Sequence, residues 1–395
     1  MNSPAVLKGI TWGHSRGFVP MVATAQRYAE LHPGVRIHWE LRSLQAFADQ
    51  SIEALAKDYD LLVIDHPSIG EAAAHGLFLA LDPHLPADFL RDQAQQSVGQ
   101  SNHSYVYAGH QWALATDAAT PVSAARPDVL QRHGCAIPDT WEELIALARR
   151  KLVAFAGMKI DCLMHWYMLC INEGAEPFTE THRIVAPEAG VRALLALKEL
   201  VDACGPDCLK HNPIAAYELL STTDDYGYSP FAYGYTNYAR PSYTRRTLQF
   251  GGLVSRNGQR LRSTLGGAGL AISANCKERQ HALDYASFVA SAETQTGLYT
   301  AMAGQPGHRA AWLNEENNRI TENFFRNTLT TLDEAYLRPR YPAYITFQEK
   351  APAVVASFLE GKIDAQAAWT GLNALDTTVR KGRLDERHEQ REQSA

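Results

Sequence analysis

The stretch Ile137-Pro-Asp-Thr-Trp-Glu-Glu-Leu144 decides the fold, and locally it predicts the start of a helix. Thr140 suits the N-cap position, and Glu143, at the third helical position, completes a capping box. Pro138 helps to end whatever precedes the helix. Alone, the stretch predicts a well-capped helix and no function, so its meaning depends on the segments around it.

The first 64 residues predict alternating strands and helices. Val6–Trp12 is a short apolar run, residues 35–41 alternate apolar and polar side chains, and Tyr59–Ile64 is a continuous apolar strand of the buried parallel kind. Helical patterns lie between them, at Pro20–Leu31 and at about Leu44–Lys57. The order strand–helix–strand–helix–strand predicts an α/β lobe with a parallel sheet.

Several segments, taken in order, resemble the solute-binding proteins of ABC importers, in particular the large sugar-type family that includes maltose-binding proteins. The resemblance spans about Val6 to Leu375, and its strength lies in the order of segments that are individually weak. After the strands of the first 64 residues, six further segments carry the resemblance. They are Gly76-Leu-Phe-Leu-Ala-Leu-Asp82, Pro138–Leu144, the helix at about Glu278–Ser291, Gly304-Gln-Pro-Gly-His-Arg309, Arg338–Tyr344 and Phe358–Lys362.

The resemblance implies a two-lobe periplasmic-binding-protein fold of type II. Each lobe would be a mixed, mainly parallel sheet flanked by helices, with a hinge cleft between the lobes. The expected N-terminal lobe is 1–116 plus 268–308, and the expected C-terminal lobe is 117–267 plus 309–379. Residues 380–395 are dense in mixed charge and are expected to be a disordered tail.

Composition agrees with a soluble globular protein of two domains. The chain has 395 residues, of which 46% are hydrophobic and 20% charged, and its formal net charge of −6 argues against a nucleic-acid partner. No apolar run approaches the length of a membrane span. No signal peptide is visible, so we expect a periplasmic protein if a signal was removed and a cytoplasmic one if Met1 is the native start. Whether Cys204 and Cys208 pair is left open.

Ligands of open α/β sheets bind beyond the carboxyl ends of strands, which selects three loops. In the loop after the first strand, glycines and a helix start accompany His14, Arg16 and Phe18, and Arg16 suits a bidentate bond to a carboxylate or phosphate. Asp65 and His66 follow the third strand. An anionic solute held by Arg16 is the first expectation, and a neutral sugar on an aromatic wall is the alternative.

Further candidates come from the lobe crossings and from an aromatic segment. Thr116 and Asp117 lie at the first expected crossing, and Gly267 lies in a glycine-rich hinge at the return crossing. Tyr228 and Tyr233 are chosen from the aromatic stretch 226–243 as stacking partners for a sugar ring or another flat ligand. The remaining candidate for the ligand site is Arg309, at the end of the segment Gly304-Gln-Pro-Gly-His-Arg309 that resembles a turn of the family.

Two functions from different classes follow. The first is non-catalytic capture of a small polar solute, a sugar, sugar derivative, organic acid or phosphate, for delivery to the membrane permease of an ABC importer. The second is a cytoplasmic enzyme or ligand sensor on the same scaffold, with His14, Asp65 and His66 as its acid–base group. These residue types also ligate zinc, but they lack a spacing motif, so no metal, no cofactor and no catalytic residue is predicted. A monomer is expected.

Overall fold

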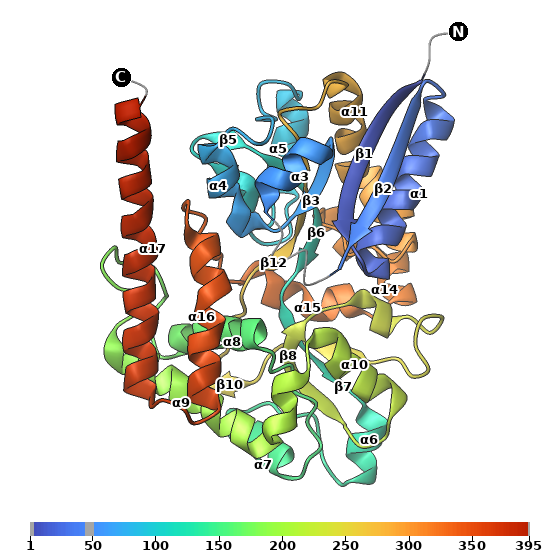
Figure 1. The fold of residues 1–395 in the computed structure, drawn as a ribbon. Coiled ribbons are helices and arrows are strands. Elements are labelled where there is room, and N and C mark those ends of the chain that lie inside the picture. The colour runs from blue at the N-terminus through green and yellow to red at the C-terminus, as the bar shows by residue number, and fades with distance from the viewer. Residues whose placement is uncertain (1–3, 44–50, 394–395) are drawn as a thin grey trace. The chain divides into compact units, whose positions relative to one another are not determined.

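The computed structural model describes residues 4–43 and 51–393, with side chains to residue 381. Contacts divide the chain into two compact units (Figure 1). Unit 1 is 1–119, 235–240 and 265–333, and unit 2 is 120–234, 241–264 and 334–395. The expected boundaries were 116/117, 267/268 and 308/309, and the contacts change unit at 119/120, at 264/265 and, last, after Asp333. The segment 235–240 was not expected in the first unit.

Unit 1 is built on a five-stranded sheet of order β2-β1-β3-β12-β6. The strands β1 (Ala5–Trp12), β2 (Val35–Arg42) and β3 (Leu61–Ile64) are parallel, as predicted. The other two, β12 (Gly266–Ile272) and β6 (Ala113–Ala119), run antiparallel to their neighbours. The sheet is therefore mixed.

Alternation along β3 explains why its sequence is apolar throughout. Leu61 and Val63 pack into one hydrophobic cluster, and Leu62 and Ile64 pack into another. Helices cover both faces, so both sets of side chains are buried. The first cluster includes residues of α1 (Ser15–Leu31) and α11 (Arg279–Ala290), and the second includes residues of α3 (Ile52–Asp58) and α4 (Ile69–Ala74).

The predicted helix at 44–57 is described only from its second half. The structure has α3 from Ile52 to Asp58, and residues 44–50 of the prediction lie outside the described residues. The rest of unit 1 is mainly helical. Its other elements include η1 (His66–Ser68), α5 (Ala87–Gln95), η2 (His103–Tyr105), α12 (Ala292–Thr294), the π-turn η5 (Gln295–Tyr299), α13 (Arg309–Leu313), α14 (Glu315–Ile320) and α15 (Phe324–Asp333). The short pair β4 (Val106–Tyr107) and β5 (His110–Gln111) completes it.

Unit 2 departs from the expected mainly parallel sheet. Its three-stranded sheet β8-β7-β9 is antiparallel, formed by β8 (Tyr228–Tyr233), β7 (Pro121–Ala125) and β9 (Gln249–Gly251). A second pair, β10 (Ser255–Arg256) and β11 (Gln259–Arg260), is also antiparallel. Within the described part of unit 2, parallel pairing is confined to isolated bridges such as Val153 with Tyr228.

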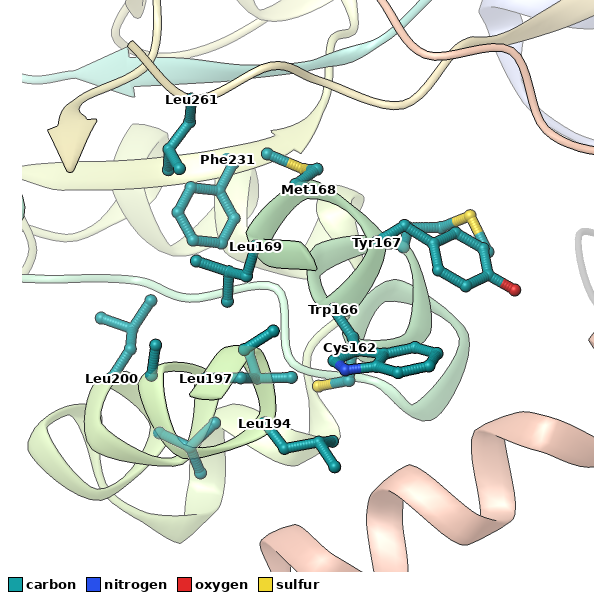
Figure 2. Packing of buried hydrophobic residues seen from close by; sticks show 14 of the residues in the cluster. Cys162, Trp166, Tyr167, Met168, Leu169, Leu194, Leu197, Leu200, Phe231 and Leu261 are labelled. Atoms are coloured by element: carbon teal, nitrogen blue, oxygen red, sulfur yellow. The ribbon is translucent and has the colours of Figure 1, made fainter. Parts of the chain in front are cut away.

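Helices supply most of the core of unit 2. Figure 2 shows side chains of α8 (Lys159–Asn172) packed against those of α9 (Pro187–Cys204), with Phe231 and Leu261 beside them. The remaining helices are α6 (Pro127–Arg132), α7 (Trp141–Arg149), η3 (Pro206–Lys210), α10 (Pro213–Thr222), α16 (Tyr344–Leu359) and α17 (Ala365–Gln393). All six cysteines are free, so Cys204 and Cys208 do not pair.

The capping box predicted at Thr140 is present at the start of α7. The Thr140 hydroxyl accepts from the Glu143 N–H at 3.3 Å, and the Glu143 carboxylate accepts from the Thr140 N–H at 3.2 Å. Trp141 is then buried in the core of unit 2. The predicted disorder of 380–395 is wrong as far as Gln393, because α17 continues to that residue. Its Arg, Lys, Glu and Gln residues are good helix formers, which the charge pattern alone did not reveal.

Candidate functional site

The loop after β1 turns directly into α1, and His14 caps that helix. The His14 backbone is extended, and its Nδ1 accepts a hydrogen bond from the Arg16 N–H at 3.0 Å. Burial, and then the positive charge of Arg16, lower the pKa of His14 to about 4. His14 is therefore neutral near pH 7 and presents a half-buried, uncharged imidazole.

Gly17 is required for α1 to start where it does. A Cβ atom at this position would lie 2.3 Å from the ring of Trp12. The Thr11 hydroxyl also donates to the Gly17 carbonyl at 3.0 Å, which ties the end of β1 to the first turn of the helix. The local sequence thus holds His14, Ser15 and Arg16 at the carboxyl end of the strand.

Arg16 is buried and forms an ion pair with Asp117 of β6. The Arg16 Nε donates to one Asp117 carboxylate oxygen at 2.8 Å, and Nη2 donates to the other. Their exposed fractions are 4% and 1%. Burial alone would lower the pKa of Arg16, but the Asp117 carboxylate outweighs it and raises that pKa above its ordinary value. Burial raises the pKa of Asp117, but the positive charge and the two hydrogen bonds of Arg16 oppose that rise. A carboxylate bonded in this way to a guanidinium keeps its charge, so together the two groups carry no net charge.

Aromatic rings enclose this ion pair. The Arg16 guanidinium lies 4.7 Å from the ring centroid of Tyr235 and 6.0 Å from that of Trp12. The buried Tyr299 forms a side-chain hydrogen bond with Thr116, the residue before Asp117. Burial raises the pKa of Tyr299 well above its ordinary value, so its hydroxyl keeps its proton.

Gly267 allows β12 to approach the strand that carries Asp117. Its φ is +98°, and an added Cβ would lie 2.4 Å from the Asp117 carbonyl oxygen. The register between β12 and β6 shifts immediately afterwards, between Ala268 and Gly269. The sequence predicted a glycine with unusual backbone angles at the return crossing. The structure supplies the reason, which is that the backbones of β12 and β6 lie too close for a side chain.

The segment Tyr235–Arg240, here called the strap, also lies on the loop after β1. It contains the 3₁₀ turn η4 (Thr236–Ala239). The Tyr235 ring meets the His14 ring edge-on at 4.7 Å, and the Asn237 amide donates to the Ser15 hydroxyl at 3.1 Å. The Thr236 N–H donates to the Gln305 side chain at 3.1 Å. The strap therefore covers part of the predicted binding loop.

The second predicted loop follows β3 and is partly a helix cap. The Asp65 carboxylate accepts from the His66 N–H at 2.9 Å, which starts η1. The His66 ring is fully buried, and its Nδ1 lies 3.2 Å from the Asp65 carboxylate. The ring also makes an edge-to-face contact with Tyr105. The Asp65 side chain is 30% exposed. Of this pair, only Asp65 is accessible to a solute.

The remaining predicted residues are placed elsewhere. Tyr228 was expected to stack on a ligand, but it is 1% exposed and its ring packs in the hydrophobic core of unit 2. The half-buried Tyr233 meets the Thr264 hydroxyl at 3.3 Å, also in unit 2. Arg309 pairs with Asp333 in unit 1, at 3.0 Å through Nη1. Phe18 is half-buried against the core of unit 1.

The structure therefore brings His14, Arg16, Thr116, Asp117 and Gly267 together in unit 1. Sequence reasoning missed four of the partners that surround them, which are Trp12, Tyr235, Asn237 and Tyr299, and considered Ser15 only as a small residue that allows close backbone approach. Tyr235 belongs to the noted aromatic stretch, but its spacing does not distinguish it from Tyr228. No group of three or more His, Cys, Asp or Glu residues able to hold a metal occurs among the described residues.

Comparison with known proteins identifies the family. A family model described as bacterial extracellular solute-binding protein matches residues 23–316. The chain belongs to this family. No curated protein sequence matches the solute-binding protein. In the part of the chain that the structure describes, no helix is long and apolar enough to cross a membrane.

Solved structures show that the solute-binding protein shares the fold of sugar-binding ABC components. Maltose-bound MalE3 of T. maritima has a TM-score of 0.83 and 16% identity, over 95% of this chain and 100% of that one. A protein of Agrobacterium radiobacter K84 in complex with ribitol has a TM-score of 0.81 and 19% identity, over 95% and 99%. A Thermotoga lettingae protein bound with tagatose has a TM-score of 0.80 and 14% identity, over 96% and 100%. At these identities the likeness shows the two-lobe fold alone.

Proposed function

We propose that this protein binds a small, neutral, hydroxyl-rich solute, a sugar or polyol, at the loop after β1, and delivers it to an ABC importer. The observation that carries the proposal is the buried ion pair of Arg16 with Asp117. The Arg16 guanidinium is the cation that an anionic solute would need, and the Asp117 carboxylate already accepts two hydrogen bonds from one edge of it. The loop therefore offers hydrogen-bonding groups without net charge.

The polar groups at this place suit hydroxyl ligands. A sugar hydroxyl both donates and accepts, so it pairs with a neutral imidazole such as His14 and with a hydroxyl such as Ser15. A neutral imidazole can give an anion a hydrogen bond but supplies no positive charge to balance it. This reasoning favours the neutral alternative over the anionic solute first expected at Arg16.

The complexes of related folds support the same class of ligand. The proteins from T. maritima, Agrobacterium radiobacter K84 and Thermotoga lettingae hold maltose, ribitol and tagatose respectively, all of them neutral. The family description adds that such proteins act outside the cytoplasm, which supports export of this chain. The enzyme alternative is not favoured, because His66 of its proposed acid–base group is fully buried beside Asp65.

A thermal-shift screen tests the proposal. We expect stabilisation by at least one of maltose, ribitol and tagatose or a related neutral solute, because a ligand that binds only the folded state stabilises it by about 2.7 kcal/mol at 100 times its Kd. Sugar phosphates and organic acids should give no shift. A shift from charged compounds alone would overturn the proposal.

A matched pair of variants connects the screen to the site. Ser15→Ala removes a hydroxyl from the loop and should weaken solute binding about tenfold, the effect of one lost hydrogen bond. Ser357→Ala removes a comparable hydroxyl, which bonds to the Ala353 carbonyl within α16 of unit 2, and should leave binding unchanged. Equal affinities for both variants would place the solute away from the loop after β1.

A further inference from the structure

The strap reaches unit 1 from a distant part of the chain. The residues before it, up to Gly234, and after it, from Pro241, belong to unit 2. Its regular structure is one 3₁₀ turn, Thr236–Ala239, which is too short to be stable without tertiary contacts. Its attachment to unit 1 therefore depends on individual side-chain and ring contacts.

These contacts engage the same groups that the proposed function assigns to the solute. The Asn237 amide donates to the Ser15 hydroxyl at 3.1 Å, and the Tyr235 ring packs edge-on against His14. Tyr235 is 8% exposed and Asn237 is 0% exposed, so both side chains are buried in this arrangement. A solute that takes over the Ser15 hydroxyl and the part of the His14 ring that Tyr235 covers would displace the strap from those residues.

The docked strap carries an energetic penalty of its own. Thr236 Oγ1, Asn237 Oδ1 and Arg240 Nε are buried and have no hydrogen-bond partner among the described residues. A buried polar atom without a partner has lost its hydrogen bonds to water and formed none in the protein, which costs free energy. Burial also lowers the pKa of Arg240 to about 10, so the site disfavours its charge. On release, all three atoms regain water.

Favourable contacts oppose this penalty. The Arg240 Nη2 donates to the Thr300 carbonyl at 2.7 Å, and the Thr236 N–H donates to the Gln305 side chain at 3.1 Å. The Gln305 amide in turn donates to the Ala118 carbonyl at 2.7 Å, beside Asp117. These bonds favour the docked strap, while its unpaired buried atoms lower the free energy needed to release it. Docking and release thus have opposing contributions, and a solute that binds only when the strap is released shifts the equilibrium towards release.

We propose that the strap Tyr235–Arg240 is a latch that docks over the loop after β1 when no solute is bound and is released when solute takes its place at His14 and Ser15. The competition with solute rests on the proposed function. The opening of the strap does not, because it follows from the contacts and the unpaired atoms alone.

Hydrogen exchange of the solute-free full chain tests the opening directly. Peptides that cover 235–240 should exchange at least about 100-fold faster than peptides of β6 and β12, because the strap opens locally while the sheet opens with the whole unit. Ser15→Ala should speed exchange of the strap about fivefold further by removing the Asn237 bond. Strap amides as protected as those of β6 would overturn the latch.

A reversible cross-link tests the competition. In the double variant Ser15→Cys with Asn237→Cys, oxidation with diamide should slow strap exchange to the rate of β6. It should also abolish the thermal shift that ribitol, tagatose or maltose produces in the reduced form, and reduction should restore that shift. Ser15→Cys alone, treated identically, is the control for the native thiols. An oxidised double variant that is stabilised as strongly as the reduced one would overturn the latch.

The two proposals fail in different ways. If none of the three solutes stabilises the wild type or the reduced variant, the proposed class of solute is wrong, and the exchange rates still decide whether the strap opens. If solutes bind but the strap is as protected as β6, the function stands and the latch is wrong.

Discussion

Arg16 and Asp117, 101 residues apart in the sequence, form a bidentate ion pair in the interior of unit 1. Arg16 lies in the first turn of α1, just after the first strand, and Asp117 lies in the second half of β6. Their pairing turns a loop that looks cationic in the sequence into a neutral one. It also makes the stability of unit 1 depend on both residues together.

Asp117→Asn should destabilise the protein by about 3–5 kcal/mol, because it leaves the Arg16 charge buried without a counter-charge. Urea unfolding followed by circular dichroism measures this loss. The control is Glu53→Gln, which breaks the exposed pair with Lys57 and should cost far less stability, because solvent screens that pair. Similar losses for both variants would show that the Arg16–Asp117 pair is not desolvated in solution.

Gly267→Ala should cost more stability than Gly109→Ala. Both glycines have positive φ, +98° and +85°, so both variants carry the backbone penalty of about 1 kcal/mol or more. Only at Gly267 would the new Cβ lie 2.4 Å from a carbonyl oxygen, while nothing lies within 4 Å at Gly109. The difference between the two unfolding free energies isolates the close approach to Asp117, and a difference near zero would contradict that approach.

Asp161→Asn should stabilise the protein at pH 7. Asp161 lies in the first turn of α8, and burial raises its pKa to about 8. Between its ordinary pKa of 3.8 and about 8, the folded state keeps a proton that the unfolded state has lost. Stability therefore falls as pH rises through this range. Asn carries no proton to lose, so the variant should gain on the order of 1–3 kcal/mol at pH 7.

The gain from Asp161→Asn should shrink as the pH is lowered towards 4, where the carboxyl group is protonated in both states. Unfolding curves at several pH values measure this. Glu188→Gln, at an exposed position in the first turn of α9, is the control for replacing a helix-start carboxylate by an amide. A variant less stable than the wild type at pH 7 would mean that Asp161 is ionised and has a bonding partner.

His14→Asn should lose the pH dependence that His14 confers while it keeps the helix cap, since Asn is among the best N-cap residues. In the folded state the pKa of His14 is lowered from 6.5 to about 4. As pH falls through this range, His14 is protonated in the unfolded state but not in the folded state. The free energy of unfolding therefore decreases. The wild type should lose on the order of 2 kcal/mol more than the variant between pH 7 and pH 5.

Direct observation of the His14 ring by NMR gives a second check. Its Cε1 proton should titrate near pH 4 in the folded wild type. A titration near pH 6.5 would show that the imidazole is solvated and is not held as an acceptor for the Arg16 N–H.

Local features of the fold were predictable because short stretches of sequence specify them. The capping box at Thr140 satisfies its own backbone N–H group and that of Glu143, so the helix start follows from four neighbouring residues. The apolar run that ends at Ile64 predicts a strand buried on both faces, and the structure confirms it. The order of such segments was sufficient to recognise the family, which the match over 23–316 confirms.

The mainly parallel sheet expected in unit 2 and the disorder expected after residue 379 were wrong for physical reasons. Strand direction depends on how the chain returns, and periodicity does not record it. A charged sequence that lacks apolar residues can still form a helix when its residues have high helix propensity, as α17 does as far as Gln393.

By itself, the sequence determined the alternation of elements, the helix caps and the candidate loop at His14, because these follow from contacts within a few residues. Only the tertiary structure decided that the loop is neutral and covered. Asp117 reaches Arg16 from another strand, and the strap reaches Ser15 from residues more than 200 positions later. The charge and access of a site depend on which distant side chains are buried beside it, and folding alone establishes that proximity.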